Sequence, residues 1–146
     1  MEEIYRLTQK RKKEIITKIS KFLKDKKNIS FAYIFGSFNE KGNFPFRDID
    51  VAVYLKPLTL KKEEVFDYET DLAIELSKII KFPADRIDIK VLNFTSLLFQ
   101  SSIFSKGLLL FFKDEEFLVR LIEKASMESV LNYEFIKRSL LELVSE

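Results

Sequence analysis

The feature that most constrains this chain is a Gly36-Ser37 pair followed, after ten residues, by an Asp-x-Asp sequence at residues 48–50. The apolar and aromatic residues 29–35 precede the pair, and the apolar residues 51–55 follow the acids. This pattern predicts two strands joined by a polar turn. A glycine lets phosphate oxygens approach backbone N–H groups of such a turn, and the serine hydroxyl adds a donor. The arrangement therefore favours binding of a nucleoside triphosphate with a divalent metal.

Asp48 and Asp50 are two residues apart in a predicted strand, so their side chains should share one face while Ile49 points to the core. Two carboxylates on one face repel each other unless a cation lies between them. The chain has no histidine and no cysteine, so only oxygen ligands are offered, and these suit Mg²⁺ or Mn²⁺ better than zinc. A third carboxylate would allow two metal ions to bind. Asp88, which alternates with apolar residues in a predicted strand, is favoured over Asp85, which lies before that strand.

Each motif also has a plainer interpretation. An isolated Asp-x-Asp is most often a solvated strand face, and an isolated Gly-Ser is most often an ordinary turn. The combination of the two at this spacing is the specific signal. We further expect residues 37–41 to form one helical turn, closed by Gly42, whose N-terminus adds positive potential near the phosphates.

Composition narrows the chemistry that the chain can perform. At 146 residues, with 47% hydrophobic and 33% charged residues, one folded α+β domain over residues 1–146 is expected. The absence of Cys and His excludes disulfides, thiolate nucleophiles, Cys/His zinc sites and Ser-His-Asp catalysis. It is also consistent with a reducing cytoplasm. A net charge of only +2 gives no reason to expect nucleic acid or an anionic membrane as the main partner.

No targeting or membrane segment is expected. The chain begins Met1-Glu2-Glu3, which is acidic and is not followed by the apolar core of a signal peptide. The most apolar stretch, Ser96–Phe112, is interrupted by polar residues and is too short for a bilayer, which needs roughly 20 apolar residues.

Periodicity and capping signals predict the remaining elements. Asn93 or Thr95 should cap a short helix that Gly107 ends, and Asp114 should cap a C-terminal helical region at 115–146 that packs on the domain. Pro57 should close the second strand. The expected helices also include 2–26 and 60–81, and the expected strands are 29–35, 47–55, 86–92 and 108–112.

Two stretches have a structural and a functional interpretation. Lys10–Lys13 in the first helix could bind nucleic acid, but a solvated helix face is favoured. The apolar positions of 115–146 should mostly cover the sheet. Their stripe is long for one small domain, so part of it is expected to face a partner or a second copy of the chain.

Taken together, three segments carry a family resemblance. Gly36-Ser37, the Asp-x-Asp pair with the apolar residues after it, and the sequence IDIKVLN at 87–93 resemble the DNA polymerase β-type nucleotidyltransferase superfamily. Within it, the short chain resembles the minimal nucleotidyltransferases, which are often the antitoxins of HEPN-domain ribonuclease toxins. The resemblance extends from the first strand to about Phe112 and implies a mixed sheet flanked by helices.

The resemblance also implies a mechanism. Asp48 and Asp50 would bind two Mg²⁺ ions, Asp88 would join them at the catalytic ion and help to deprotonate the acceptor, and Gly36 with Ser37 would hold the triphosphate of ATP. The activity implied is transfer of AMP from ATP to a tyrosine of the HEPN toxin, which blocks its RNase activity.

The chain departs from the family pattern at two positions. Lys41 stands where many members have a second glycine, and the nearest glycine here is Gly42. Arg47 stands where many have serine before the first Asp; pairing with a nearby acid is favoured over phosphate binding.

Alternative functions remain open at this stage. The acceptor could be a small-molecule hydroxyl such as an aminoglycoside, although no second domain is evident that would form its pocket. The chain could instead neutralise a toxin by binding alone, with an inactive site. Nucleic-acid binding has the least support.

Overall fold

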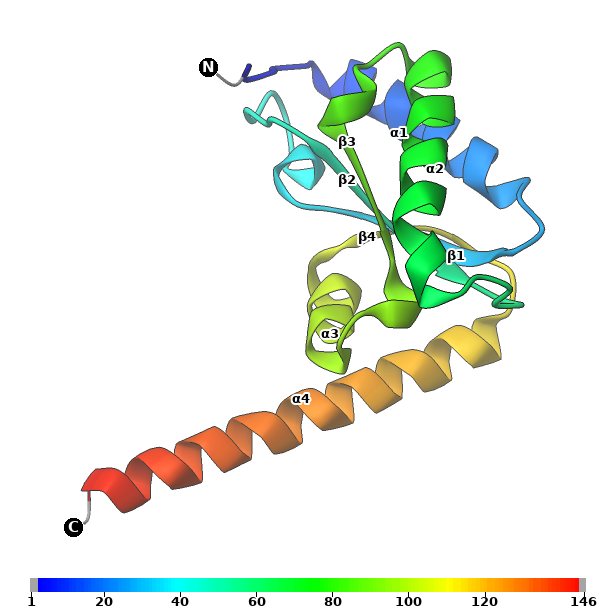
Figure 1. The fold of residues 1–146 in the computed structure, drawn as a ribbon. Helices are drawn as coiled ribbons and strands as arrows, with labels where there is room; N and C mark the ends of the chain where they lie inside the picture. The colour runs from blue at the N-terminus through cyan, green and yellow to red at the C-terminus, as the bar shows by residue number, and fades with distance from the viewer. Residues whose placement is uncertain (1–2, 145–146) are drawn as a thin grey trace.

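A four-stranded mixed sheet forms the centre of the computed structural model, which describes residues 3–144 (Figure 1). The strand order is β3-β2-β1-β4. β1 pairs antiparallel with both β2 and β4, whereas β2 pairs parallel with β3. The strands are β1 (Ile29–Phe35), β2 (Ile49–Leu55), β3 (Ile87–Val91) and β4 (Leu108–Phe112). The mixed sheet flanked by helices confirms the α+β fold expected from the sequence.

Helices cover both faces of this sheet. α1 (Gln9–Lys24) and α2 (Val65–Ile80) pack on one face, where the alternating apolar residues of β2 and β3 point. α3 (Leu97–Lys106) and the beginning of α4 (Glu115–Val144) cover the other face, against the aromatic residues of β1. The alternation along β3 is strict, since Ile87, Ile89 and Val91 are buried while the residues between them are not.

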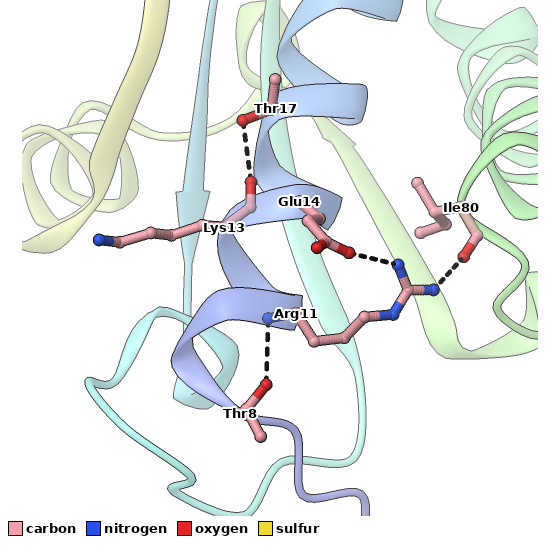
Figure 2. A network of polar contacts seen from close by, with 6 residues as sticks. All are labelled: Thr8, Arg11, Lys13, Glu14, Thr17 and Ile80. Atoms are coloured by element: carbon pink, nitrogen blue, oxygen red, sulfur yellow. Dashed lines mark hydrogen bonds and ion pairs between the residues drawn. The ribbon is translucent and has the colours of Figure 1, made fainter.

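α1 is fixed to α2 through an arginine at its first turn (Figure 2). The Thr8 hydroxyl caps α1 by accepting the Arg11 backbone N–H at 3.1 Å. The Arg11 guanidinium donates to the Ile80 carbonyl at 3.5 Å and to the Glu14 carboxylate at 3.4 Å. A cation at the last carbonyls of α2 is favourable because the C-terminal end of a helix carries partial negative charge.

The structure corrects several predicted boundaries. The first helix starts at Gln9, not at residue 2, because Tyr5 forms a β-bridge with Phe46 instead; Glu2 itself lies outside the described residues. The second strand starts at Ile49, two residues later than expected, so Asp48 immediately precedes it. α3 is capped by Ser96, whose hydroxyl accepts the Phe99 N–H, not by Asn93 or Thr95.

Other capping predictions are confirmed. Gly107 ends α3, and its N–H donates to the Ile103 carbonyl at 2.7 Å. Asp114 caps α4 by accepting the Phe117 N–H at 3.1 Å. The second strand ends at Leu55, two residues before Pro57.

α4 is a single helix of 30 residues, and its C-terminal part projects away from the rest of the molecule (Figure 1). Its first turns pack on the domain, since Leu118 and Ala125 are buried. Farther along, apolar side chains are exposed instead of covering the sheet: Met127, Val130, Leu131, Tyr133, Phe135, Leu140 and Leu141. The predicted region extends to residue 146, and its last two residues lie outside those described. Within residues 3–144, no helix combines the length and apolar character that crossing a bilayer requires.

Candidate active site

The predicted acids meet at one end of the central strands. The parallel register pairs Asp50 of β2 directly with Asp88 of β3, and the antiparallel register pairs Asp50 with Phe35 of β1. Asp48 lies two residues before Asp50, at the entrance to β2. Because side chains on paired positions point to the same face, the Asp50 and Asp88 carboxylates share one face of the sheet, and the apolar residues that alternate with them point to α1 and α2.

The turn after β1 lies directly against Asp50. Gly36 has φ = 77°, a backbone conformation that glycine adopts without strain. A Cβ atom at this position would overlap the Asp50 Oδ2 atom, so only glycine fits. The helical turn that follows is a 3₁₀ turn over Ser37–Asn39, which is shorter than the turn expected over residues 37–41. The Gly-Ser turn and the second acid are therefore in contact, as their spacing suggested.

Burial and neighbouring negative charges perturb Asp50. Its pKa is raised from 3.8 to about 6, mainly by burial and then by the charges of Asp88 and Asp48, while Lys90 opposes the shift. Asp48 is held by an ion pair between its Oδ1 atom and Arg86 Nη1, at 3.8 Å. The ionised form of Asp50 thus lacks sufficient compensating positive charge in the protein itself.

Whether these residues suit a divalent cation depends on donor chemistry and on spacing. The donors are carboxylates only, which Mg²⁺ and Mn²⁺ prefer; burial, and then the neighbouring carboxylates, raise the pKa of Asp50, and a cation would favour its ionised form. Among residues 3–144, no three acidic side chains are close enough together to form a preassembled metal site. Like charges without a cation between them repel, and Asp48 is drawn to Arg86. The chemistry of the donor set therefore fits the ion.

A cavity of about 380 Å³ opens beside these acids. Its lining includes Ser37, Asp48 and Asp50 together with Arg47 and the N-terminal residue Ile4. Asp88 instead lines a separate groove of about 520 Å³ between α2 and the edge of β3. Three of the five predicted site residues, Ser37, Asp48 and Asp50, therefore line the cavity, and Gly36 lies against Asp50.

Two residues that sequence reasoning did not assign to the site also shape it. Arg86 pairs with Asp48, and its only sequence signal is its position two residues before Asp88. Lys12, expected on a solvated helix face, is only 1% exposed and reaches the loop before Asp48. Nothing in the local sequence distinguishes it from the neighbouring lysines.

Asp85, the rival third acid, lies in a 3₁₀ turn (Ala84–Arg86) before β3 and lines the groove but not the cavity. It does not share the register of Asp50, whereas Asp88 does. The geometry therefore favours Asp88, as the strand alternation did.

Comparison with known proteins identifies relatives of this fold. Residues 17–116 match the family described as polymerase beta, nucleotidyltransferase. No protein of curated function matches the chain.

Several solved structures with the same fold are described as toxin–antitoxin complexes. One is a tri-AMPylated Shewanella oneidensis HEPN toxin in complex with MNT antitoxin, at 21% identity and TM-score 0.61, covering 92% of this chain and 99% of that chain. Another is a toxin–antitoxin with AMP-PNP, at 23% identity and TM-score 0.60, covering 90% and 98%. A third is the toxin–antitoxin MntA-HepT, at 20% identity and TM-score 0.57, covering 95% and 100%. At these identities the similarity establishes a shared fold.

Proposed function

Because the chain belongs to the polymerase beta nucleotidyltransferase family, we propose that it transfers AMP from ATP to a tyrosine hydroxyl of a HEPN ribonuclease toxin and so acts as its antitoxin. In this proposal residues 1–146 act as one nucleotidyltransferase domain in the cytoplasm, with Mg²⁺ as the metal. Mn²⁺ could replace it.

The observation that carries the proposal is the contact between the Gly-Ser turn and the acid pair. Gly36 lies against Asp50, and Ser37 shares a cavity with Asp48 and Asp50. A triphosphate held by backbone N–H groups and the Ser37 hydroxyl would lie beside the carboxylates that bind its metal. Nucleotidyl transfer depends on alignment and charge neutralisation more than on a protein nucleophile. With divalent ions bound, the turn and the carboxylates would supply both without histidine or cysteine.

Each residue has a defined role in the proposed reaction. Gly36 and Ser37 would hold the phosphates, Asp48, Asp50 and Asp88 would hold the divalent metal ions, and Asp88 would also accept the proton of the tyrosine hydroxyl. Bound divalent ions would neutralise the phosphate charge and polarise the α-phosphate. The tyrosine oxygen forms a bond to the α-phosphorus while the bond from that phosphorus to the bridging oxygen breaks. Pyrophosphate leaves with that oxygen.

The partner assignment has two supports. The chains that share this fold were solved in complexes described as a tri-AMPylated HEPN toxin with MNT antitoxin and a toxin–antitoxin with AMP-PNP. In addition, the outer part of α4 presents apolar side chains to solvent, including Leu131 at 58% and Phe135 at 70% exposure. A surface of this kind on a single projecting helix is typical of a protein-binding site. We propose that the toxin packs there.

The test is incubation of the chain with Mg²⁺, ATP and the protein encoded beside it, followed by mass spectrometry of that neighbour. We expect added mass in steps of one AMP, located on tyrosine. Asp50→Ala should reduce transfer at least 1000-fold, because the carboxylate is required at the metal. The matched control, Asp71→Ala on the exposed face of α2, should transfer at the normal rate.

The remaining outcomes distinguish the alternatives. Full transfer by Asp50→Ala would refute the site assignment. Toxin neutralisation by Asp50→Ala at the same dose as the unchanged chain, without modification of the toxin, would identify a non-catalytic antitoxin that acts by binding.

A further inference from the structure

The loop between the Gly-Ser turn and the acid pair, residues 36–48, is the segment that sets their separation. It carries Ser37 at one end and Asp48 at the other, and it lines the cavity with Pro45 and Phe46. Its first part is a single 3₁₀ turn, and Gly42 has a left-handed backbone with φ = 72°. Such a loop lacks the ladder hydrogen bonds of a strand, so other contacts must fix its position.

Lys12 of α1 supplies such contacts from beneath the loop. Its Nζ atom donates to the Glu40 carbonyl at 3.0 Å and to the Phe44 carbonyl at 3.4 Å. The same atom lies 5.6 Å from the ring centre of Phe38 and 5.5 Å from that of Phe46. Both rings are buried and pack edge to face at 4.8 Å. The ammonium is thus enclosed by two carbonyls and two aromatic faces, all belonging to the loop.

Two further contacts fasten the same loop to the N-terminal segment. The Gln9 Oε1 atom, one turn before Lys12 on α1, accepts the Gly42 N–H at 2.7 Å. Tyr5 exchanges two backbone hydrogen bonds with Phe46, at 2.7 and 3.0 Å. Residues 5–12 therefore hold the loop by hydrogen bonds to Glu40, Gly42, Phe44 and Phe46.

Burial of a lysine is costly in itself. Desolvation lowers the pKa of Lys12, and a buried ammonium is retained only where its hydrogen bonds compensate. A methionine of similar length could fill the same space without that cost. Unlike methionine, the lysine donates hydrogen bonds to two specific carbonyls. These directional bonds hold the loop in one position.

We propose that Lys12 is a positioning residue for the nucleotide. Its ammonium holds the loop so that Ser37 and Asp48 face one cavity at the separation that a triphosphate and its metal require. Lys12 does not touch the cavity itself, so it acts through the loop. This inference rests on the proposed function, because it assumes that the cavity binds ATP.

The variant that tests the proposal is Lys12→Met, which keeps the length of the side chain and removes its donors. Below its melting temperature the variant should bind Mg²⁺ with a non-hydrolysable ATP analogue about tenfold more weakly, measured by calorimetry. Amide hydrogen exchange in residues 40–46 should accelerate at least tenfold, while exchange in the core of the sheet should not change. The KM for ATP should rise more than kcat falls, because the carboxylates are unaltered.

Two variants serve as controls. Lys13→Met, at the exposed neighbouring position, makes the same change of charge and should leave both readouts unchanged. Lys12→Arg keeps a charged donor and should recover part of the nucleotide affinity.

Separate results would overturn the positioning role and the proposed function. Unchanged exchange and unchanged nucleotide affinity in Lys12→Met would overturn the positioning role, even if the melting temperature fell.

If Lys12→Met does not fold, Gln9→Ala tests the same loop from the surface and should accelerate exchange at Gly42 and weaken nucleotide binding about threefold. Unchanged exchange there would likewise contradict the proposal. Accelerated exchange in Lys12→Met, with no nucleotide binding by the unchanged chain, would instead contradict the proposed function.

Discussion

At the scale of single residues, Asp50 is held in an environment that disfavours its charge. It is partly buried, lies beside Asp88 in the parallel register and follows Asp48 by two positions. Gly36 leaves no room for a side chain between the turn and this carboxylate. The ionised Asp50 carboxylate would therefore be more stable beside a bound cation than in the metal-free protein. Functional residues commonly lower the stability of the fold in this way.

The pKa of Asp50 predicts a pH-dependent stability of the metal-free chain. Because the pKa is about 6 in the folded state against 3.8 as the ordinary value, the folded chain holds this proton more tightly than the unfolded chain. The contribution of Asp50 to the free energy of unfolding therefore falls as pH rises through that window. Asp50→Asn should be more stable than the unchanged chain at pH 7 and similar to it near pH 4, measured by urea unfolding with EDTA. A stability difference independent of pH would contradict this, and Asp71→Asn is the control.

The third carboxylate can be identified by a pair of substitutions. Asp88→Asn should lower transfer at least 100-fold, because Asp88 shares the register of Asp50. Asp85→Asn should change the rate less than threefold, because Asp85 lies in the turn before β3 and outside the cavity. The measurement is the initial rate of AMP incorporation at saturating ATP. A larger loss in Asp85→Asn than in Asp88→Asn would reverse the assignment.

At the scale of elements, α4 has two parts with different roles. The part near Leu118 packs with α3 and the aromatic face of the sheet, and Ala125 is also buried. Beyond Ala125 most apolar side chains are exposed, as the helix extends away from the sheet (Figure 1). The first part contributes to the stability of the domain, and the second is available to another protein.

Truncation of one leucine in each part should separate these roles. Leu118→Ala should reduce the free energy of unfolding by about 2–4 kcal/mol, because Leu118 is only 4% exposed and a cavity would remain. Leu131→Ala should change it by less than about 0.5 kcal/mol, because Leu131 is 58% exposed. Urea denaturation of the isolated chain measures both. Leu131→Ala should, however, weaken binding to the proposed toxin, and unchanged affinity would argue that the toxin binds elsewhere.

At the scale of the whole molecule, the site depends on three segments that are distant in sequence. β1 leads into the Gly-Ser turn, β2 carries Asp50 after Asp48, and β3 brings Asp88 beside it. α1 fixes the connecting loop from below through Lys12. Ligand binding should therefore stabilise the entire fold and not only a local loop.

This predicts a specific thermal shift. At a concentration about 100 times its dissociation constant, ATP with Mg²⁺ should stabilise the chain by about 2.7 kcal/mol, and the melting temperature should rise. Removal of Mg²⁺ with EDTA should abolish most of the shift, since the carboxylates would then repel the phosphates. Differential scanning calorimetry measures the shift with Mg²⁺ and with EDTA. A shift of equal size in EDTA would show that ATP binds without the acids.

Local patterns predicted most of the elements but not their exact ends. The alternation in Ile87, Ile89 and Val91 identified β3, and the cap at Asp114 identified the start of α4. The first helix was extended too far because apolar residues at helical spacing continue before Thr8. Bonds between Tyr5 and Phe46, far apart in sequence, hold that segment in a bridge.

The sequence by itself determined which residues share a face, because side-chain direction in a strand repeats every two residues and depends only on local geometry. It therefore predicted a common face for Asp48 and Asp50, it favoured Asp88 over Asp85 as the third acid, and it indicated the Gly-Ser turn. Only the tertiary structure decided that Asp88 lies opposite Asp50, that Lys12 is buried beneath the loop, and that α4 leaves the domain. These three features depend on contacts between segments that are distant in sequence. The periodicity of the local sequence does not encode such contacts.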